Sequence, residues 1–133
     1  MALTRTIRGS LNASAEARAA VGHCDADLGW RAGDARMIAS ELVLNAWQHG
    51  HGLDERPIAL TLTTVDDGGI RIEVRDRGDG FDVDDAIANT RPHEPGWGLT
   101  IIRALSDDWG VERNGGTCVW ATVLPRSDHP GLG

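Results

Sequence analysis

A first group of residues with types and spacing that suit binding or catalysis lies in the stretch 40–50, SELVLNAWQHG. If the stretch is helical, Glu41 and Asn45 lie one above the other on one face, and His49 follows one turn later. Leu42 falls on nearly the same side, so a carboxylate and an amide share a stripe with core residues. Burying such groups costs free energy unless something binds them. The stripe therefore indicates either a binding site or a capped, solvated helix face.

Three glycine-bearing segments follow along the chain: 76–80 (DRGDG), 96–99 (GWGL) and 116–117 (GT). Asp76 comes directly after an apolar strand pattern, where a carboxylate can accept a hydrogen bond from an exocyclic amine, and the glycines let a flat ring approach the backbone. Backbone N–H groups at a glycine-rich helix start form a phosphate site. The hydroxyl of Thr117 could assist the carboxylate. Each segment alone is also typical of plain turns, and none matches the full GxGxxG fingerprint.

The elements that must position these residues can be read from hydrophobic periodicity. Strands are predicted at 3–11, 58–64, 70–75 and 117–124, with a shorter one around Val111. Helices are predicted at 15–24, from a cap at Asp34 to about Gln48, and at 98–105, with a polar connection at 25–33 and a loop at 76–95. This order predicts an α+β fold, a two-layer sandwich in which a mixed, mostly antiparallel β-sheet carries helices on one face. We expect one domain over residues 1–124 and a flexible tail over 125–133.

Composition excludes several classes of protein. The chain has 133 residues and a formal net charge of −7, which argues against a nucleic-acid binder. All 13 basic residues are arginine, and without lysine there can be no P-loop, no protein kinase of the usual fold and no pyridoxal phosphate Schiff base. No apolar run is long enough to span a membrane, and the first residues lack a signal-peptide core. Cys24 and Cys118 lack metal-site spacing and are expected to be small buried or half-buried thiols.

Taken together, the motifs ExxxNAxxHG, DxGxG about thirty residues later, GxGL and GGT resemble those of the GHKL ATPase superfamily over residues 3–124. The stretch SELVLNAWQHG resembles the N box of anti-sigma-factor serine/threonine kinases of the RsbW type. The ending DDWGVERNGGTCVWATV is similar to that of the single-domain actinobacterial members. This resemblance implies a histidine-kinase-like ATPase fold with ATP and Mg²⁺ as ligands.

The resemblance also implies roles for individual residues. Asn45 would ligate a Mg²⁺ ion that bridges the ATP phosphates, and Glu41 would orient or deprotonate the attacking hydroxyl. Asp76 would bind the adenine amine, with support from Thr117. The remaining residues implied in nucleotide binding are His49, Gly78, Gly80, Arg91, Gly96, Trp97, Gly98 and Leu99, with 81–95 as a lid. For His49, a helix-terminal role favoured by the dipole is the alternative.

One departure from the family pattern concerns phosphoryl transfer. Kinase members can carry an arginine just before the GxG segment, whereas this chain has His93, Glu94 and Pro95 there. Arg91 is the nearest substitute, and an acidic side chain at Glu94 is unfavourable beside a triphosphate. Nucleotide binding is therefore better supported than transfer of a phosphoryl group.

The function implied by the resemblance is an ATP- and Mg²⁺-binding regulator in a partner-switching module. It would hold a sigma factor, or phosphorylate an anti-sigma-factor antagonist on serine, as a cytoplasmic homodimer with no direct contact to nucleic acid or membrane. Three alternatives remain open: a non-catalytic module that uses nucleotide only to shape its partner surface, a detached histidine-kinase-like ATPase domain, and a domain whose motifs bind nothing. The identity of the partner and the roles of the two cysteines are not readable from the sequence.

Overall fold

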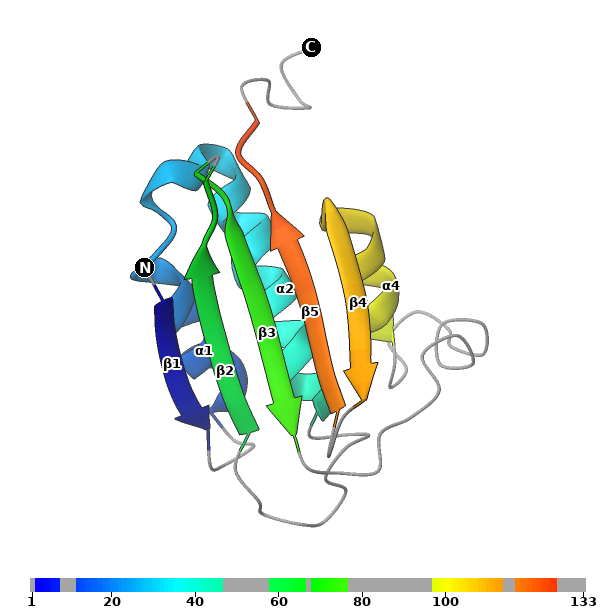
Figure 1. Cartoon of the computed structure of the whole chain (residues 1–133). Coiled ribbons are helices and arrows are strands. Elements are labelled where there is room, and N and C mark those ends of the chain that lie inside the picture. Colours follow the sequence, from blue (N-terminus) through cyan, green and yellow to red (C-terminus); the bar gives the residue numbers. More distant parts are fainter. Residues whose placement is uncertain are drawn as a thin grey trace.

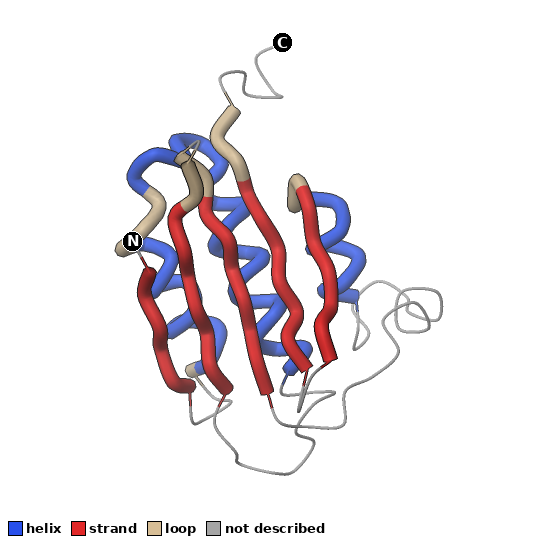
Figure 2. Tube along the Cα trace, in the orientation of Figure 1, coloured by secondary structure: helices blue, strands red, loops and turns tan. Residues whose placement is uncertain are grey.

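Five strands formed by the alternating segments make one sheet with the order β1-β2-β3-β5-β4, and every pairing between them is antiparallel. The computed structural model of the chain describes residues 2–7, 12–46, 58–66, 68–76, 97–113 and 117–126. Its elements are β1 (Ala2–Ile7), α1 (Ala13–Gly22), the 3₁₀ helix η1 (Ala26–Arg31), α2 (Ala32–Asn45), β2 (Ile58–Thr64), β3 (Ile70–Asp76), α4 (Trp97–Leu105), β4 (Asp108–Arg113) and β5 (Thr117–Val123). Figure 1 shows α1, α2 and α4 on one face of the sheet, and Figure 2 shows the same two layers as helix and strand. The predicted α+β sandwich is confirmed, and no parallel pair occurs among the strands described.

The core lies between the sheet and the helices. The inward residues of the hairpin β2–β3 are at most 2% exposed, and they are Ile58, Leu60, Leu62, Ile70, Ile72 and Val74. Small residues on α1, including Ala13 and Ala17, let that helix lie close against the sheet and α2. The central helix α2 packs between α1 and α4 and across β3 and β5, burying Ile38, Leu42 and Val43. The predicted apolar face of the hairpin is thus confirmed.

None of the described helices lies on the opposite face of the sheet, which is polar, as the charged alternation of the hairpin predicts (Figure 1). Glu73 lies opposite Trp120 in the β3–β5 register. The guanidinium of Arg71 lies 4.2 Å from the centre of the Trp120 ring and 2.6 Å from a carboxylate oxygen of Glu73. The ring in turn lies over Gly110, where an added Cβ would come within 2.8 Å of it.

Several predicted boundaries shift in the structure. The helix α1 begins at Ala13 rather than residue 15, and Asn12 at its N-cap position makes no side-chain capping bond. The connection predicted at 25–33 contains the 3₁₀ helix η1 over Ala26–Arg31, and α2 already begins at Ala32, two residues before the predicted cap. Asp34 is therefore not the cap of α2 but lies in its first turn. This position is also favourable for a carboxylate, because it lies near the positive end of the helix dipole. Residues 8–11 and the helix end expected near Gln48 lie outside the described residues.

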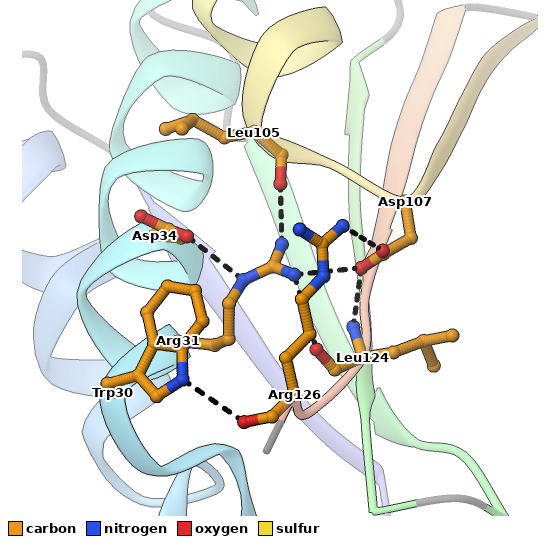
Figure 3. Close-up of polar contacts among 7 residues, drawn as sticks. All are labelled: Trp30, Arg31, Asp34, Leu105, Asp107, Leu124 and Arg126. Atoms are coloured by element: carbon orange, nitrogen blue, oxygen red, sulfur yellow. Dashed lines mark hydrogen bonds and ion pairs between the residues drawn. The ribbon is translucent and has the colours of Figure 1, made fainter. Parts of the chain in front are cut away.

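Arg31 is the largest fully buried side chain of the described core, at 1% exposure, although the sequence places it in a polar connection. Its Nη2 donates to the carbonyl of Leu105 at 2.6 Å, and its Nε lies 2.9 Å from a carboxylate oxygen of Asp34 (Figure 3). Its Nη1 lies 3.4 Å from the carbonyl of Leu124 and 3.4 Å from Oδ2 of Asp107. One guanidinium thus joins the start of α2 to the end of α4 and the segment after β5.

Asp107 extends this cluster toward the surface. It accepts a hydrogen bond from the Leu124 backbone N–H at 2.8 Å and from Arg126 Nη2 at 2.7 Å. Burial alone would raise the pKa of Asp107, but these hydrogen bonds and the charge of Arg31 outweigh burial, so the pKa is lowered. The indole N–H of Trp30 donates to the carbonyl of Arg126 at 3.1 Å. Arg126, which the sequence assigns to a flexible tail, is therefore held on both sides, whereas residues 127–133 lie outside the described part.

Both cysteines are free thiols, as expected. Cys24 is half-buried and Cys118 is buried, and burial raises the pKa of each thiol. A raised pKa keeps a thiol protonated at neutral pH, so neither is primed as a nucleophile. Among the described helices, none is long and apolar enough to cross a membrane.

Candidate functional site

Asp76 and Thr117 meet at one edge of the sheet. Asp76 is the last residue of β3 and Thr117 is the first of β5, and the antiparallel register places them directly opposite each other. They follow the inward pair Val74 and Val119 in this register, so both face the helix layer. Asp76 is 4% exposed and Thr117 is 2% exposed. A carboxylate and a hydroxyl are thus carried side by side into the interior.

The hydroxyl of Thr117 is buried and, within the described residues, its Oγ1 has no hydrogen-bond partner. Leaving a buried hydroxyl unpaired costs about 1–3 kcal/mol, so such groups are rare unless they serve a purpose. A hydroxyl can donate one bond and accept two, and an ionised carboxylate only accepts. Together they suit a flat heterocycle that presents an amine beside a ring nitrogen.

The central helix brings an amide and a second carboxylate toward the same edge. Asn45 ends α2 and is 2% exposed, and its Nδ2 also has no partner in the part of the chain that the structure describes. Glu41 lies one turn earlier and is half-buried, and this burial raises the pKa of its carboxyl group. Figure 1 shows the end of α2 at the edge where β3 ends and β5 begins. The predicted polar stripe is present, and its neighbour Leu42 is buried at 1% exposure.

A half-buried carboxyl with a raised pKa is a stronger base than an exposed one, which suits the removal of a proton from a hydroxyl. The amide oxygen of Asn45 can ligate a hard cation, and its N–H group can donate a hydrogen bond to an anion. No group of three or more His, Cys, Asp or Glu side chains that could hold a metal occurs among the described residues.

The structure places only some of the other predicted residues. Trp97, Gly98 and Leu99 form the first turn of α4, which points toward the same edge (Figure 1). The first backbone N–H groups of a helix have no partner inside it and are available to an anion. The following predicted residues lie outside the described part of the chain: His49, Gly78, Gly80, Arg91 and Gly96, together with the predicted lid 81–95.

A hollow in the described structure lies elsewhere and contains none of these residues. It opens between the edge strand β1 and α1. Its lining residues are Arg5, Thr6, Ile7, Glu16, Ala19, Ala20 and His23. The candidate chemistry therefore does not belong to that hollow. Sequence reasoning also missed the buried cluster around Arg31, and no local signal could have revealed it, since its partners come from distant segments.

Comparison with known proteins gives matches over most of the chain. Residues 2–123 match the family model described as "Histidine kinase-like ATPase domain". The anti-sigma F factor of Geobacillus thermodenitrificans (strain NG80-2) is 33% identical over 95 residues, which is 65% of this chain and 65% of that protein. The chain thus spans slightly less than two thirds of the length of that relative. The serine-protein kinase RsbW of Bacillus velezensis is 28% identical over 109 residues, 72% of this chain and 68% of that protein.

Solved structures share the fold. The structure of the RsbU and RsbW domains of Rv1364c from Mycobacterium tuberculosis matches with a TM-score of 0.66 and 24% identity, covering 93% of this chain and 32% of that one. A chain of the SiaB–SiaC complex from Pseudomonas aeruginosa matches with a TM-score of 0.64 and 15% identity, covering 91% of this chain and 88% of that one. At these identities the likeness concerns the fold alone.

Proposed function

This chain belongs to the histidine kinase-like ATPase family, and we propose that it binds ATP and acts as a regulator of the anti-sigma-factor serine/threonine kinase type. The family predicted from the motifs is confirmed by the match over residues 2–123. The regulatory role is suggested by the relatives, an anti-sigma F factor and a serine-protein kinase RsbW. The observation that carries the proposal is the buried Asp76–Thr117 pair at the edge where α2 ends with Asn45.

Asp76 and Thr117 would hold the adenine ring. The carboxylate accepts from the exocyclic amine, and the Thr117 hydroxyl, unpaired within the described structure, supplies a second bond to the ring. Gly78 and Gly80, just after the strand, would leave room for the base. This arrangement favours adenine over guanine, which carries a carbonyl oxygen where adenine carries its amine.

Asn45 and the first turn of α4 would hold the phosphates. The amide oxygen of Asn45 would ligate Mg²⁺, and the unpaired Nδ2 could donate to a phosphate oxygen. Gly96, Trp97, Gly98 and Leu99 would wrap the phosphates, with His49 and Arg91 as further contacts. When bound, Mg²⁺ neutralises charge on the phosphates. The residues present fit a bound nucleotide, because the unpaired Nδ2 of Asn45 and Oγ1 of Thr117 would then gain partners, and the Asn45 amide oxygen suits the accompanying cation.

Calorimetric titration with ATP, with and without Mg²⁺, tests the nucleotide site. We expect Mg²⁺-dependent binding that is lost in Asp76→Asn, because an amide presents a donor where the base requires an acceptor. Asp108→Asn is the matched control, since this exposed carboxylate begins β4 at the far end of the sheet and should leave binding unchanged. Absence of binding at millimolar ATP, or equal loss in both variants, would refute the site.

We propose Glu41 as the group that orients or deprotonates the acceptor hydroxyl. Its raised pKa supports this role, whereas Glu94 in the predicted lid weighs against transfer. Incubation with γ-labelled ATP and a candidate antagonist should give labelled serine in the wild type and none with Glu41→Ala. ATP binding without transfer would favour the second candidate, a non-catalytic nucleotide-dependent binding module. An acid-labile product would indicate transfer to histidine instead.

The proposed partners are proteins, namely a sigma factor and an anti-sigma antagonist, met in the cytoplasm by a homodimer of this chain. Co-purification of the chain with the sigma factors of its own genome, with and without ATP, tests the partner. Light scattering of the purified chain tests the dimer. A monomer that captures no sigma factor or antagonist in either state would contradict this part of the proposal.

A further inference from the structure

Three of the four elements proposed to carry the nucleotide site are joined to one another at their opposite ends. The site ends are Asn45 on α2, the first turn of α4 and Thr117 on β5. The other ends are the start of α2 beside Arg31, the carbonyl of Leu105 that closes α4, and the carbonyl of Leu124 just after β5. Figure 3 shows the Arg31 guanidinium between them.

The contact with α4 is the strongest of these. Arg31 Nη2 donates to the Leu105 carbonyl at 2.6 Å, compared with 3.4 Å from Nη1 to the Leu124 carbonyl. The carbonyls in the last turn of a helix lack partners inside it and carry the negative end of its dipole, so a buried guanidinium there is well matched. A carboxylate oxygen of Asp34 lies 2.9 Å from Nε and balances the guanidinium charge from the other side.

The helix α4 depends on this contact more than its neighbours do. Strand β5 is held along both edges by hydrogen bonds to β3 and β4, and α2 is packed on both sides by α1 and α4. Of the α4 side chains whose burial is described, Ile102 alone is fully buried. Helices can shift by about 1–2 Å along a packed interface, so a contact at one end provides a restraint along the helix axis. The Arg31–Leu105 bond supplies that axial restraint.

We propose that Arg31 is a positioning residue: by holding the end of α4, it sets where the first turn of α4 lies against the nucleotide phosphates. This inference rests on the proposed nucleotide site. Misplacement of a binding group by 1 Å can cost a large factor in function even when the change is far from the chemistry. The adenine contacts on β3 and β5 should be much less affected, because the sheet ladder holds them independently of Arg31.

The test compares Arg31→Lys, which keeps the charge but loses the planar fork, with the wild type and with Leu62→Val. Leu62→Val is the matched control, a core truncation in β2, which β3 and β5 separate from β4, the strand that α4 packs against. We expect Arg31→Lys to weaken Mg²⁺-ATP binding about tenfold, the order by which residues outside a ligand's contacts usually act. The affinity for AMP, which lacks the outer phosphates, should stay within about twofold of the wild-type value when it is measured by competition with ATP.

A purely stabilising role of Arg31 predicts a different result, because any variant that stays folded would then bind ATP and AMP as the wild type does. Equal affinities, or equal losses for both nucleotides, would overturn the proposal. If Arg31→Lys does not fold, Asp34→Asn serves instead, because it removes the half-buried ion-pair partner of the guanidinium and should weaken ATP binding selectively, to a smaller extent. Unchanged ATP binding in that variant would equally count against the inference.

A measurement without nucleotide separates this inference from the proposed function. Amide hydrogen exchange of the ligand-free protein should be faster across Trp97–Leu105 in Arg31→Lys than in Leu62→Val, relative to exchange in β3. If the wild type fails to bind ATP, the proposed function fails, and the exchange data alone then decide whether Arg31 holds α4. Exchange in α4 no faster than in the control would overturn the anchoring role whatever the nucleotide result.

Discussion

Replacing Thr117 by valine should make the ligand-free protein more stable and its ATP binding weaker. Valine has the shape of threonine and suits a strand equally well, so the change removes the hydroxyl alone. The Thr117 Oγ1 is buried without a partner in the described structure, and an unsatisfied buried hydroxyl costs about 1–3 kcal/mol. We therefore expect the free energy of unfolding to rise by about 1–2 kcal/mol.

That gain should be visible as a thermal shift. At about 2.1 cal/mol/K per residue, the entropy of unfolding of a chain of this length makes 1 kcal/mol worth roughly 3–4 °C in melting temperature. The loss of one hydrogen bond to the base should weaken ATP binding about threefold to tenfold. Calorimetric melting and ATP titration on the same samples measure both effects.

Thr122→Val is the control for this experiment, because Thr122 lies on the same strand with its side chain on the uncovered face. It should change ATP binding little and show the effect of valine on strand stability by itself. A ligand-free Thr117→Val protein that is less stable than wild type by 1 kcal/mol or more would refute the reasoning, because the hydroxyl would then have a partner. Unchanged ATP affinity would remove Thr117 from the nucleotide site.

Four further substitutions test other parts of the structure by urea denaturation. Glu41→Gln should raise the free energy of unfolding at pH 7 by less than about 1 kcal/mol and should reduce the loss of stability that occurs as pH rises above 4.5. The reason is that a carboxyl group whose pKa is raised in the folded state costs stability when it ionises. The effect is small because water screens this half-buried group. Gly110→Ala should lower the free energy of unfolding by about 1–3 kcal/mol, because the new Cβ would lie 2.8 Å from the Trp120 ring. Gly33→Ala in α2 meets nothing within 4 Å and should raise it by up to about 1 kcal/mol. If Gly33→Ala were the more destabilising change, the packing of Trp120 over Gly110 would be contradicted. Asp107→Asn should lower the free energy of unfolding at neutral pH and make it decrease less as pH falls below about 3.9. The reason is that the lowered pKa of Asp107 makes its ionised form the stabilising one. An unchanged dependence of stability on acidic pH would count against the cluster.

The local features of the fold were predictable because they depend on neighbouring residues. The alternation in β2 and β3 gave the hairpin with its buried face, and helical spacing put Glu41 and Asn45 on a partly buried stripe. The fold family followed from the order of short motifs. These signals survive in the structure because apolar periodicity and tertiary burial agree in these elements.

The long-range features were not predictable from such patterns. The sequence named Asp76 and Thr117 separately, and only the β3–β5 register sets them opposite each other. Arg31 stood in a polar run that reads as a surface connection, yet its carbonyl partners lie 74 and 93 residues further along the chain. A charged residue is buried when distant acceptors converge on it, and no local periodicity carries that information.

The strand order has a consequence for synthesis on the ribosome. The first 46 residues contain β1, α1 and α2, but of the strands against which those helices pack they contain only the edge strand β1. The edge strand β1 pairs only with β2, and α2 contacts β3 and β5. The nascent chain therefore exposes two apolar helix faces until the β2–β3 hairpin, complete at Asp76, has emerged. That hairpin, whose contacts are local, is the first unit able to cover them, and the C-terminal strands then complete the sheet.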